Sequence, residues 1–374
     1  MHIAIFGCGQ LAQMTAEAGI KLDFTFSFVA DEGEDYRCVA SLGDVVVYTH
    51  IMSAETLFDQ LQKPDVITVE KEMVDATLLK SLKEFSTVYP CSSAIKIAQN
   101  RIREKNYLRS LDIPTADFER VTSVGQLNKL MDSFGLPLYI KAAESGYDGY
   151  HQWCIKNKAD VHGISLVAAI DQGLNLIAEK HVPYKREVSV IAARNSNGDT
   201  AFYPLMDNRH EDGVLVATIA PAPDAESGVQ QQAFNYMKRL LVEMDYVGVL
   251  TMECFETDDG IVVNELAPRV HNSGHWTIEG CATSQFENHC RAIANMKLGS
   301  TNMDGVAGIV NILGTHGNPQ QFSDDNVYYH AYGKEERPRR KLGHVTIRSN
   351  KIETLKESLN HVITQLYADS YPPL

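Results

Sequence analysis

The chain has 374 residues, of which 44% are hydrophobic and 22% charged, and this length predicts two or three domains. A mean hydropathy of -0.20 and the lack of a long apolar run argue against a membrane span, and the first residues lack the basic start of a signal peptide. The net charge of -14 argues against nucleic-acid binding, which needs clustered Lys and Arg. We therefore expect a cytoplasmic enzyme with neither a membrane nor a nucleic-acid partner.

The seven cysteines are irregularly spaced and none forms a C-x-x-C pair. Zinc sites and disulfide frameworks both depend on regular cysteine spacing. We therefore expect reduced thiols and no zinc site, in keeping with a cytoplasmic protein.

The first 93 residues alternate strand and helix patterns. Strands are expected at 2–6, 24–30, 44–48 and 65–69, with helices at 10–19 and 54–62. Such alternation predicts a parallel α/β sheet of Rossmann-like type.

The pattern changes at residue 94. A basic amphipathic helix is expected at 94–110, and closely spaced strands after it favour an antiparallel α+β domain. These strands are expected at 137–143, 152–156, 176–182, 187–193, 201–205, 249–256 and 261–266. A last segment has strands at 308–313, 327–332 and 343–348 and a helix at 352–367.

A glycine turn follows the first expected strand. Gly7 and Gly9 fit the start of G-x-G-x-x-A, and Asp31 and Glu32 follow the second strand, about where a dinucleotide-binding protein would hold a ribose. This pattern leaves an NAD-dependent oxidoreductase open as an alternative. Many α/β sheets turn in this way without binding a cofactor.

A second glycine loop, at 145–150, lies between two expected strands. No G-K-[ST] follows it, so it is not a P-loop. It is either a lid over nucleotide phosphates, with Lys141 adding charge, or an ordinary hairpin loop.

Two glutamates occupy one expected hairpin, at 251–265. Pairing Thr257 with Ile261 across a three-residue turn places Glu253 opposite Glu265, with β-carbons about 5 Å apart. Like charges so placed repel, and a hard cation such as Mg²⁺ would relieve the repulsion. The alternative is a solvated sheet face with the register slipped by one residue. In this register Asn264 faces the other way unless a bulge re-aims it.

The next segment, 269–275, is rich in Arg, His, Asn and Ser. His271, His275 and Glu279 have helical zinc spacing, but Pro268, Asn272, Ser273 and Gly274 disfavour a helix. We therefore expect an anion- or substrate-binding loop, with a helix-capping loop as the alternative.

The segment KEERPRRK at 334–341 carries five positive charges in an acidic chain. It is either a solvated turn or a site for a substrate phosphate, for which Arg supplies paired donors.

Together these stretches resemble the ATP-grasp superfamily and, more narrowly, the PurK-type carboxyaminoimidazole ribonucleotide synthetase family, over nearly the whole chain. The most specific stretch is NELAPRVHNSGHWT at 264–277, followed by TSQF at 283–286. Supporting matches lie at 9–11, 99–101, 146–149, 179–182, 186–190 and 340–344.

The resemblance implies a three-domain ATP-grasp architecture, α/β and α+β. It comprises an N-terminal parallel α/β domain at 1–93, a central ATP-grasp domain at 94–299 with a lid subdomain at about 115–182, and a small C-terminal β-rich domain at 300–374. The implied reaction carboxylates the amine of 5-aminoimidazole ribonucleotide through carboxyphosphate. Bicarbonate is the co-substrate, and ATP and Mg²⁺ are the cofactors.

The resemblance also implies roles for the matching residues. The metal ligands would be Glu253 and Glu265. The residues acting on bicarbonate and carboxyphosphate would be Arg269, His271, Asn272 and Ser273. The ATP contacts would be Arg101, Lys141, Gly146, Tyr147, Asp148, Gly149, Tyr150, His151, Gln152, Glu179, Lys180, His181, Val182, Glu187, His210, Asn264 and Glu265. The ribonucleotide contacts would be Gln10, Leu11, Tyr147, Asp148, Lys334, Arg340 and Lys341.

The chain departs from the family pattern at four places. Cys8 replaces a usual Gly, and Tyr150 replaces a usual Lys or Arg. Residues 71–74 read KEMV, with Met73 in place of Asn, where the family usually has Phe-Glu-Asn-Val, and residues 142–145 read AAES, with Glu144, where it usually has a basic residue and a second Gly. These departures leave open another ATP-grasp carboxylate–amine ligase or a non-catalytic nucleotide-binding protein. The family implies a homodimer, as two-fold assemblies are common, and a hand-off of product to the next mutase of the purine pathway.

Overall fold

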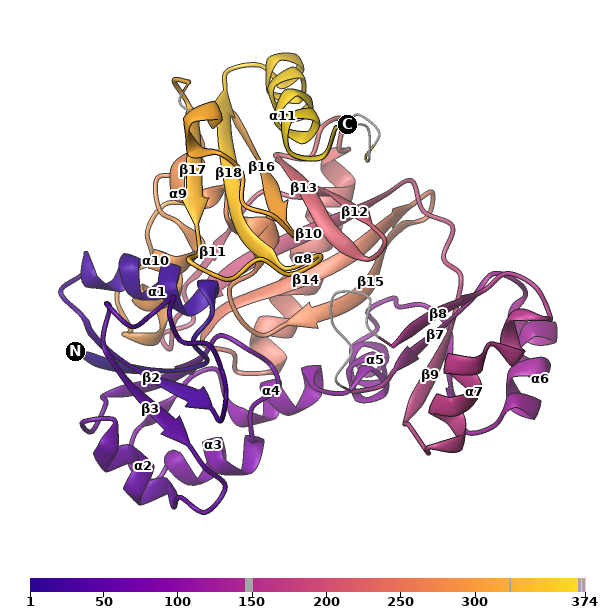
Figure 1. Cartoon of the computed structure of the whole chain (residues 1–374), viewed down its shortest axis with the longest axis horizontal. Coiled ribbons are helices and arrows are strands. Elements are labelled where there is room, and N and C mark those ends of the chain that lie inside the picture. The colour runs from indigo at the N-terminus through magenta and orange to yellow at the C-terminus, as the bar shows by residue number, and fades with distance from the viewer. Residues whose placement is uncertain (145–150, 323, 369–370, 372–373) are drawn as a thin grey trace.

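The computed structural model describes residues 1–144, 151–322, 324–368, 371 and 374. Its strands form a five-stranded, a four-stranded and a nine-stranded sheet. Figure 1 shows the four-stranded sheet and its helices standing apart from the rest, with the other two sheets side by side. No helix in the described ranges is long and apolar enough to cross a bilayer.

The N-terminal sheet is parallel, as predicted, with the order β3-β2-β1-β4-β5. Its strands are β1 (His2–Phe6), β2 (Thr25–Asp31), β3 (Asp44–Tyr48), β4 (Val66–Val69) and β5 (Thr87–Val88), and its helices α1 (Gln10–Ile20), α2 (Ala54–Gln60) and α3 (Ala76–Leu82). Ile3 and Ile5 pack in one core cluster, whereas Ala4 and Phe6 pack in another. Both faces of β1 are therefore buried, as is usual in parallel sheets.

The single helix expected at 94–110 is wrong. The structure has two helices there, α4 (Ser92–Ala98) and α5 (Arg101–Ser110). Asn100 lies between them in an extended conformation, and its side chain accepts a hydrogen bond from the Arg103 backbone at 3.0 Å. Asparagine is a strong N-cap, so the local sequence QNR starts a new helix.

The four-stranded sheet is antiparallel, with the order β6-β9-β7-β8. Its strands are β6 (Phe118–Val121), β7 (Leu138–Ala142), β8 (Gln152–Ile155) and β9 (Leu176–Lys180), and it carries α6 (Val124–Phe134), η1 (Asp160–His162) and α7 (Ile164–Asp171). Leu127, Leu138 and Leu166 are fully buried in its core cluster. The loop expected at 145–150 lies outside the described residues.

The nine-stranded sheet joins the central and C-terminal segments, with the order β15-β14-β10-β12-β13-β16-β18-β17 and β11 beside β10. Its strands are β10 (Arg186–Arg194), β11 (Thr200–Phe202), β12 (Met206–Glu211), β13 (Val214–Ala220), β14 (Gly248–Thr257), β15 (Gly260–Ala267), β16 (Val306–Leu313), β17 (Val327–Ala331) and β18 (Lys341–Ser349). The sequence analysis missed β12 and β13. Because β13 pairs with β16, the C-terminal strands extend the central sheet.

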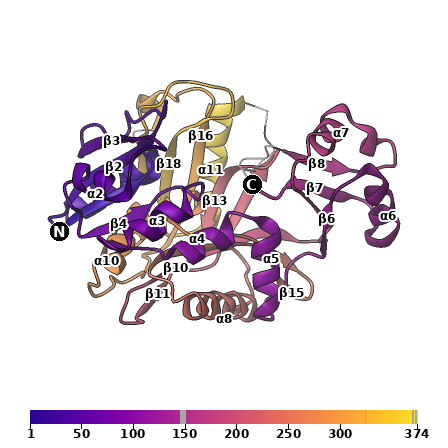
Figure 2. The same cartoon turned by 90° about the horizontal axis from the view of Figure 1, so that it is seen from below.

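The helices that accompany this sheet are α8 (Ser227–Glu243), η2 (Asn272–Gly274), α9 (Thr277–Gly280), α10 (Gln285–Ile293), η3 (Pro319–Phe322) and α11 (Ile352–Tyr367). Figure 2 shows α8 beneath β10 and β15, and α10 close to the N-terminal sheet. There Phe286 and Cys290 of α10 share a core cluster with Ile3 of β1. This packing brings the N-terminal sheet against the central sheet.

The β14–β15 hairpin confirms that Glu253 faces Glu265, although the predicted turn is wrong. Thr257 pairs with Gly260 across two residues, and the register then shifts beside Glu253. Asn264 is the extra residue of this bulge, and bulges re-aim side chains. Its Oδ1 lies 3.4 Å from the Nζ of Lys141.

Candidate active site

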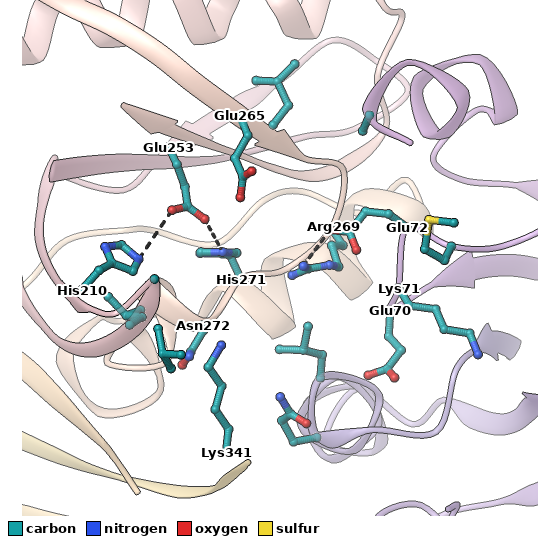
Figure 3. A pocket seen from close by; sticks show the side chains of 18 of the residues that line it. Glu70, Lys71, Glu72, His210, Glu253, Glu265, Arg269, His271, Asn272 and Lys341 are labelled. Carbon is teal, nitrogen blue, oxygen red and sulfur yellow. Dashed lines mark ion pairs between the residues drawn. The ribbon is translucent and has the colours of Figure 1, made fainter. Parts of the chain in front are cut away.

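A cavity of about 730 Å³ lies where the N-terminal sheet, α4 and α5, and the nine-stranded sheet meet (Figure 3). Among the residues singled out in the sequence, its wall contains Gln10, Leu11, Arg101, His210, Glu253, Glu265, Arg269, His271, Asn272, Lys334, Arg340 and Lys341. The sequence analysis missed four acidic or basic residues of this wall: Glu70, Lys71, Glu72 and Glu104. Residues from sequence positions 10 to 341 therefore converge on one site.

The carboxylates of Glu253 and Glu265 hang side by side from the hairpin at one side of this cavity (Figure 3). The Oε1 of Glu253 lies 2.8 Å from Nε2 of His271, and its Oε2 lies 3.8 Å from Nε2 of His210. Burial raises the pKa of Glu253, but His271, His210 and Lys341 outweigh burial and lower it to about 2. Glu253 is therefore ionised at neutral pH and offers its carboxylate oxygens to a cation.

Glu265 is paired with Arg101, whose Nη1 lies 2.5 Å from its Oε2. Burial and the charge of Glu265 raise the pKa of the neighbouring Glu104 to about 8. The two carboxylates on facing strands repel each other, and the raised pKa keeps Glu104 behind them largely protonated at neutral pH. These oxygen donors suit Mg²⁺, which takes one or two carboxylates and completes its shell with phosphate and water.

A buried ion network lies next to the carboxylate pair. Glu179 of β9 lies 2.7 Å from Nζ of Lys141 and 3.3 Å from Nζ of Lys105. Burial raises the pKa of Glu179, but the two lysines and Arg101 lower it to about 2. The sequence analysis missed Lys105, although a lysine one helical turn after Arg101 on the inner face of α5 was the available signal. Cations cluster here against the four-stranded sheet.

The loop after β15 presents its side chains to the middle of the cavity. Nη2 of Arg269 lies 2.6 Å from Oε1 of Glu72, which ties the central sheet to the N-terminal domain. Asn272 is buried, and both polar atoms of its amide have no hydrogen-bond partner among the described residues. Ser273 is fully buried beneath the loop. A side-chain amide and a guanidinium at this place fit a small anion.

The basic segment forms the opposite wall. Lys334 donates to Oε1 of Gln10, and Nη2 of Arg340 lies 3.4 Å from Oδ2 of Asp35. Lys341 begins β18 and points into the cavity (Figure 3). Burial lowers the pKa of Lys334. Lys334, Arg340 and Lys341 therefore line the cavity, whereas residues 335–339 between them are exposed to water.

The glycine turn after β1 is already filled by a side chain. The carboxylate of Glu70 accepts hydrogen bonds from the backbone of Gly9 at 2.8 Å and of Ala12 at 3.0 Å. A β-carbon added to Gly7 would come within 2.3 Å of Glu70. A dinucleotide fold keeps this helix terminus for its pyrophosphate, so the geometry counts against the oxidoreductase alternative.

The remaining predicted residues lie around the four-stranded sheet. Gly146, Tyr147, Asp148, Gly149 and Tyr150 lie outside the described residues, as the fold description states for their loop. His151 and Gln152 are exposed at the start of β8, and Lys180 is exposed at the end of β9. His181 and Val182 belong to the connection from β9 to β10.

Glu187 lines a second, smaller cavity of about 360 Å³, which it shares with His210. Its Oε2 lies 2.8 Å from Nδ1 of His210. Burial lowers the pKa of His210, but Glu187 and Glu253 raise it above its ordinary value. His210 therefore links the two cavities.

No described group of three or more His, Cys, Asp or Glu side chains forms a metal cluster, and every cysteine is a free thiol. His275 is fully buried and belongs to a short 3₁₀ turn instead of a zinc-binding helix. The predicted lack of a continuous helix through His271 and His275 is therefore confirmed.

A lid-like antiparallel sheet, a central sheet with paired carboxylates and two lysines between them define an ATP-grasp enzyme. Three domain families match in succession: the ribonucleotide synthetase preATP-grasp domain at residues 1–99, the ATP-grasp domain at 106–286, and the phosphoribosylaminoimidazole carboxylase C-terminal domain at 307–358. The chain belongs to the N5-carboxyaminoimidazole ribonucleotide synthase family.

The relatives support this family assignment over nearly the full length of the chain. The N5-carboxyaminoimidazole ribonucleotide synthase of Pseudomonas aeruginosa is 40% identical over 368 residues, covering 97% of this chain and 98% of its own. The solved synthetase of Thermus thermophilus has a TM-score of 0.89 and 36% identity, covering 100% of this chain and 99% of its own. An Aspergillus clavatus synthase in complex with ADP and 5-aminoimidazole ribonucleotide has a TM-score of 0.87 and 25% identity, each chain covered to 98%.

Proposed function

We propose that the protein carboxylates 5-aminoimidazole ribonucleotide on its amine, using ATP and bicarbonate, and so forms N5-carboxyaminoimidazole ribonucleotide, ADP and phosphate. The observation that carries the proposal is the cavity itself, where a carboxylate pair faces a basic wall across the loop of Arg269 to Asn272. Family membership and the ligands of the Aspergillus relative support the same reaction.

Bicarbonate is a poor electrophile, so it must be activated. An oxygen of bicarbonate attacks the γ-phosphorus of ATP, ADP leaves, and carboxyphosphate results. The amine nitrogen then attacks the carboxyl carbon, the bond from that carbon to the phosphate oxygen breaks, and the amine loses a proton. Phosphoryl transfer depends mainly on positioning and charge neutralisation.

The protein supplies these two effects from named groups. Glu253 and Glu265 would hold Mg²⁺, with Asn264 beside them; the metal would neutralise charge on the transferred phosphoryl group. Lys141, Lys105 and Arg101 would bind the ATP phosphates, and Glu179 holds the two lysines in place.

The nucleotide would extend from these cations toward Glu187 and His210, with the connection at Lys180 to Val182 beside the adenine. The loop at 145–150, with His151 and Gln152, would cover the phosphates. A closed site would keep the labile carboxyphosphate from water.

Arg269, His271, Asn272 and Ser273 would orient bicarbonate and carboxyphosphate between the two substrates. The unpartnered amide of Asn272 would be satisfied by such an anion. A buried polar group without a partner costs about 1–3 kcal/mol, so the bound anion would recover that energy.

The ribonucleotide would lie against the basic wall. Lys334, Arg340 and Lys341 would bind its phosphate, and Gln10 and Leu11 would contact the remainder, together with Tyr147 and Asp148. We further propose that the protein is a cytoplasmic homodimer that hands its product to the next mutase of the pathway.

The deciding experiment measures ADP release with ATP–Mg²⁺ while bicarbonate and the ribonucleotide are omitted in turn. The proposal expects full turnover only when both are present. Turnover that ignores the ribonucleotide but requires another amine would favour a different ATP-grasp ligase. Nucleotide binding without turnover under any condition would favour a non-catalytic protein.

A further inference from the structure

A directed chain of buried hydrogen bonds leads from the core of the nine-stranded sheet to His271. The Thr218 hydroxyl donates to Oδ1 of Asn208 at 3.0 Å, and Nδ2 of Asn208 donates to the hydroxyl of Ser189 at 2.8 Å. Ser189 in turn donates to the hydroxyl of Ser273 at 2.9 Å. All four side chains are buried, from 0% to 5% exposed, so water does not compete for these bonds.

The chain ends on one ring nitrogen of His271. The hydroxyl of Ser273 lies 2.9 Å from Nδ1, and its backbone N–H donates to the same nitrogen at 3.2 Å. A backbone N–H can only donate, so Nδ1 must accept. The Ser273 hydroxyl receives the proton of Ser189, so its own proton is available for Nδ1 as well.

The other ring nitrogen therefore carries the proton. Nε2 of His271 lies 2.8 Å from Oε1 of Glu253 and borders the main cavity. The backbone of His271 is fixed independently, because Gln285 accepts from its N–H at 2.9 Å and donates to its carbonyl at 2.6 Å. Gln285 thus fixes the position of the His271 backbone, whereas Ser273 determines which ring nitrogen carries the proton.

We propose that Asn208 and Ser189 are positioning residues that hold His271 as the Nε2–H tautomer, so that the nitrogen facing the cavity is a hydrogen-bond donor. The inference rests on the proposed function, because its benefit depends on an anionic reactant beside His271. An Nε2–H donates to Glu253 and to bicarbonate or carboxyphosphate. The opposite tautomer would present a lone pair to both, which repels them.

Asn208→Asp offers a sharp perturbation of nearly unchanged shape. A carboxylate cannot donate, so Ser189 would turn its proton toward the new carboxylate. Ser273 would then donate to Ser189, so Nδ1 of His271 would keep only the backbone N–H of Ser273 as a donor, and the preference for the Nε2–H tautomer would weaken. Cutting the chain with Ser189→Ala in the same protein should cancel this effect, whereas a purely electrostatic effect of the new charge would survive.

The test is nitrogen NMR of histidine-labelled full-length protein at pH 8, with the His271 signals assigned by their loss in His271→Gln. We expect the Nε2–H tautomer in the wild type, a raised Nδ1–H population in Asn208→Asp, and a return to the wild-type pattern in the double variant. The control Asn235→Asp adds the same charge at an exposed position of α8 and should leave the His271 signals unchanged. A wild-type Nδ1–H ring, or unchanged signals in Asn208→Asp, would overturn the proposal.

Kinetics supply the second readout. Loss of one well-placed donor to a developing anion lowers kcat about 10²-fold, so Asn208→Asp should lower kcat by that order and leave the KM for ATP within about twofold. A KM for ATP that rises by as large a factor as kcat falls would indicate a merely structural role and refute the positioning role. If the wild type does not carboxylate the ribonucleotide at all, the proposed function fails while the NMR result still decides the tautomer.

Discussion

Glu265→Gln tests the carboxylate pair most directly. The change keeps the shape of the side chain but removes the charge of one of the two hairpin carboxylates that we propose hold Mg²⁺. Losing a charged ligand of Mg²⁺ should raise the barrier to phosphoryl transfer by about 3 kcal/mol, or on the order of 10²-fold in rate. The assay is ADP release in the presence of bicarbonate, the ribonucleotide and saturating Mg²⁺. Turnover within a few-fold of the wild type would place the metal elsewhere.

The same variant should remain folded, which separates chemistry from stability. It loses the ion pair with Arg101, in which Glu265 is 34% exposed, and such pairs contribute about 0–1 kcal/mol. It also removes the repulsion between Glu265 and its neighbour Glu253. The two effects oppose each other, so we expect a free energy of unfolding within about 1 kcal/mol of the wild type. Asp259→Asn, at the exposed turn of the same hairpin, is the matched control and should retain turnover.

Three further predictions concern the basic wall, the glycine turn and the buried side chain of His289 in α10. Arg340→Ala should raise the KM for the ribonucleotide by about tenfold or more, since a charge-assisted contact is worth about 1.5–3 kcal/mol, and leave the KM for ATP unchanged; an equal rise in both would refute the phosphate assignment. Titration calorimetry should detect no NADH binding, because Glu70 fills the glycine turn; micromolar binding would contradict this. Burial lowers the pKa of His289 to about 4, so the unfolded chain binds the extra proton between pH 6.5 and 4 and stability falls as the pH falls through this range. Chemical unfolding at pH 7.5 and 4.5 should show a loss about 2–3 kcal/mol larger in the wild type than in His289→Gln; equal losses would refute it.

The sequence predicted the parts of the fold that depend on local pattern. Alternating strands and helices indicated the parallel sheet, and the amphipathic helix at 352–367 matches α11. The missed strand β12 is polar along most of its length, whereas β13 follows Asp212-Gly213, a hairpin-turn signal that the sequence analysis did not use. The break at Asn100 was readable from its capping preference, but the helical pattern on both sides masked it.

The hairpin shows how two local errors can leave a site prediction intact. The turn is one residue shorter than expected, and this alone would have moved Glu253 away from Glu265. The bulge at Asn264 restores the pairing. A bulge of this kind is selected by contacts far away in sequence, here with Lys105 and Lys141, so the turn sequence carries no sign of it.

The cavity is divided by charge, and this division explains why residues from all parts of the chain are needed. Glu265, Lys105 and Lys141 lie toward the four-stranded sheet, whereas Lys334 and Arg340 contact Gln10 and Asp35 of the N-terminal domain. ATP with a metal suits the first side, and a phosphate monoester suits the second. The loop from Arg269 to Asn272 stands between them, and Glu72 fixes its first residue across the domain boundary. The small anion that reacts with both substrates would therefore be held at the place that borders both.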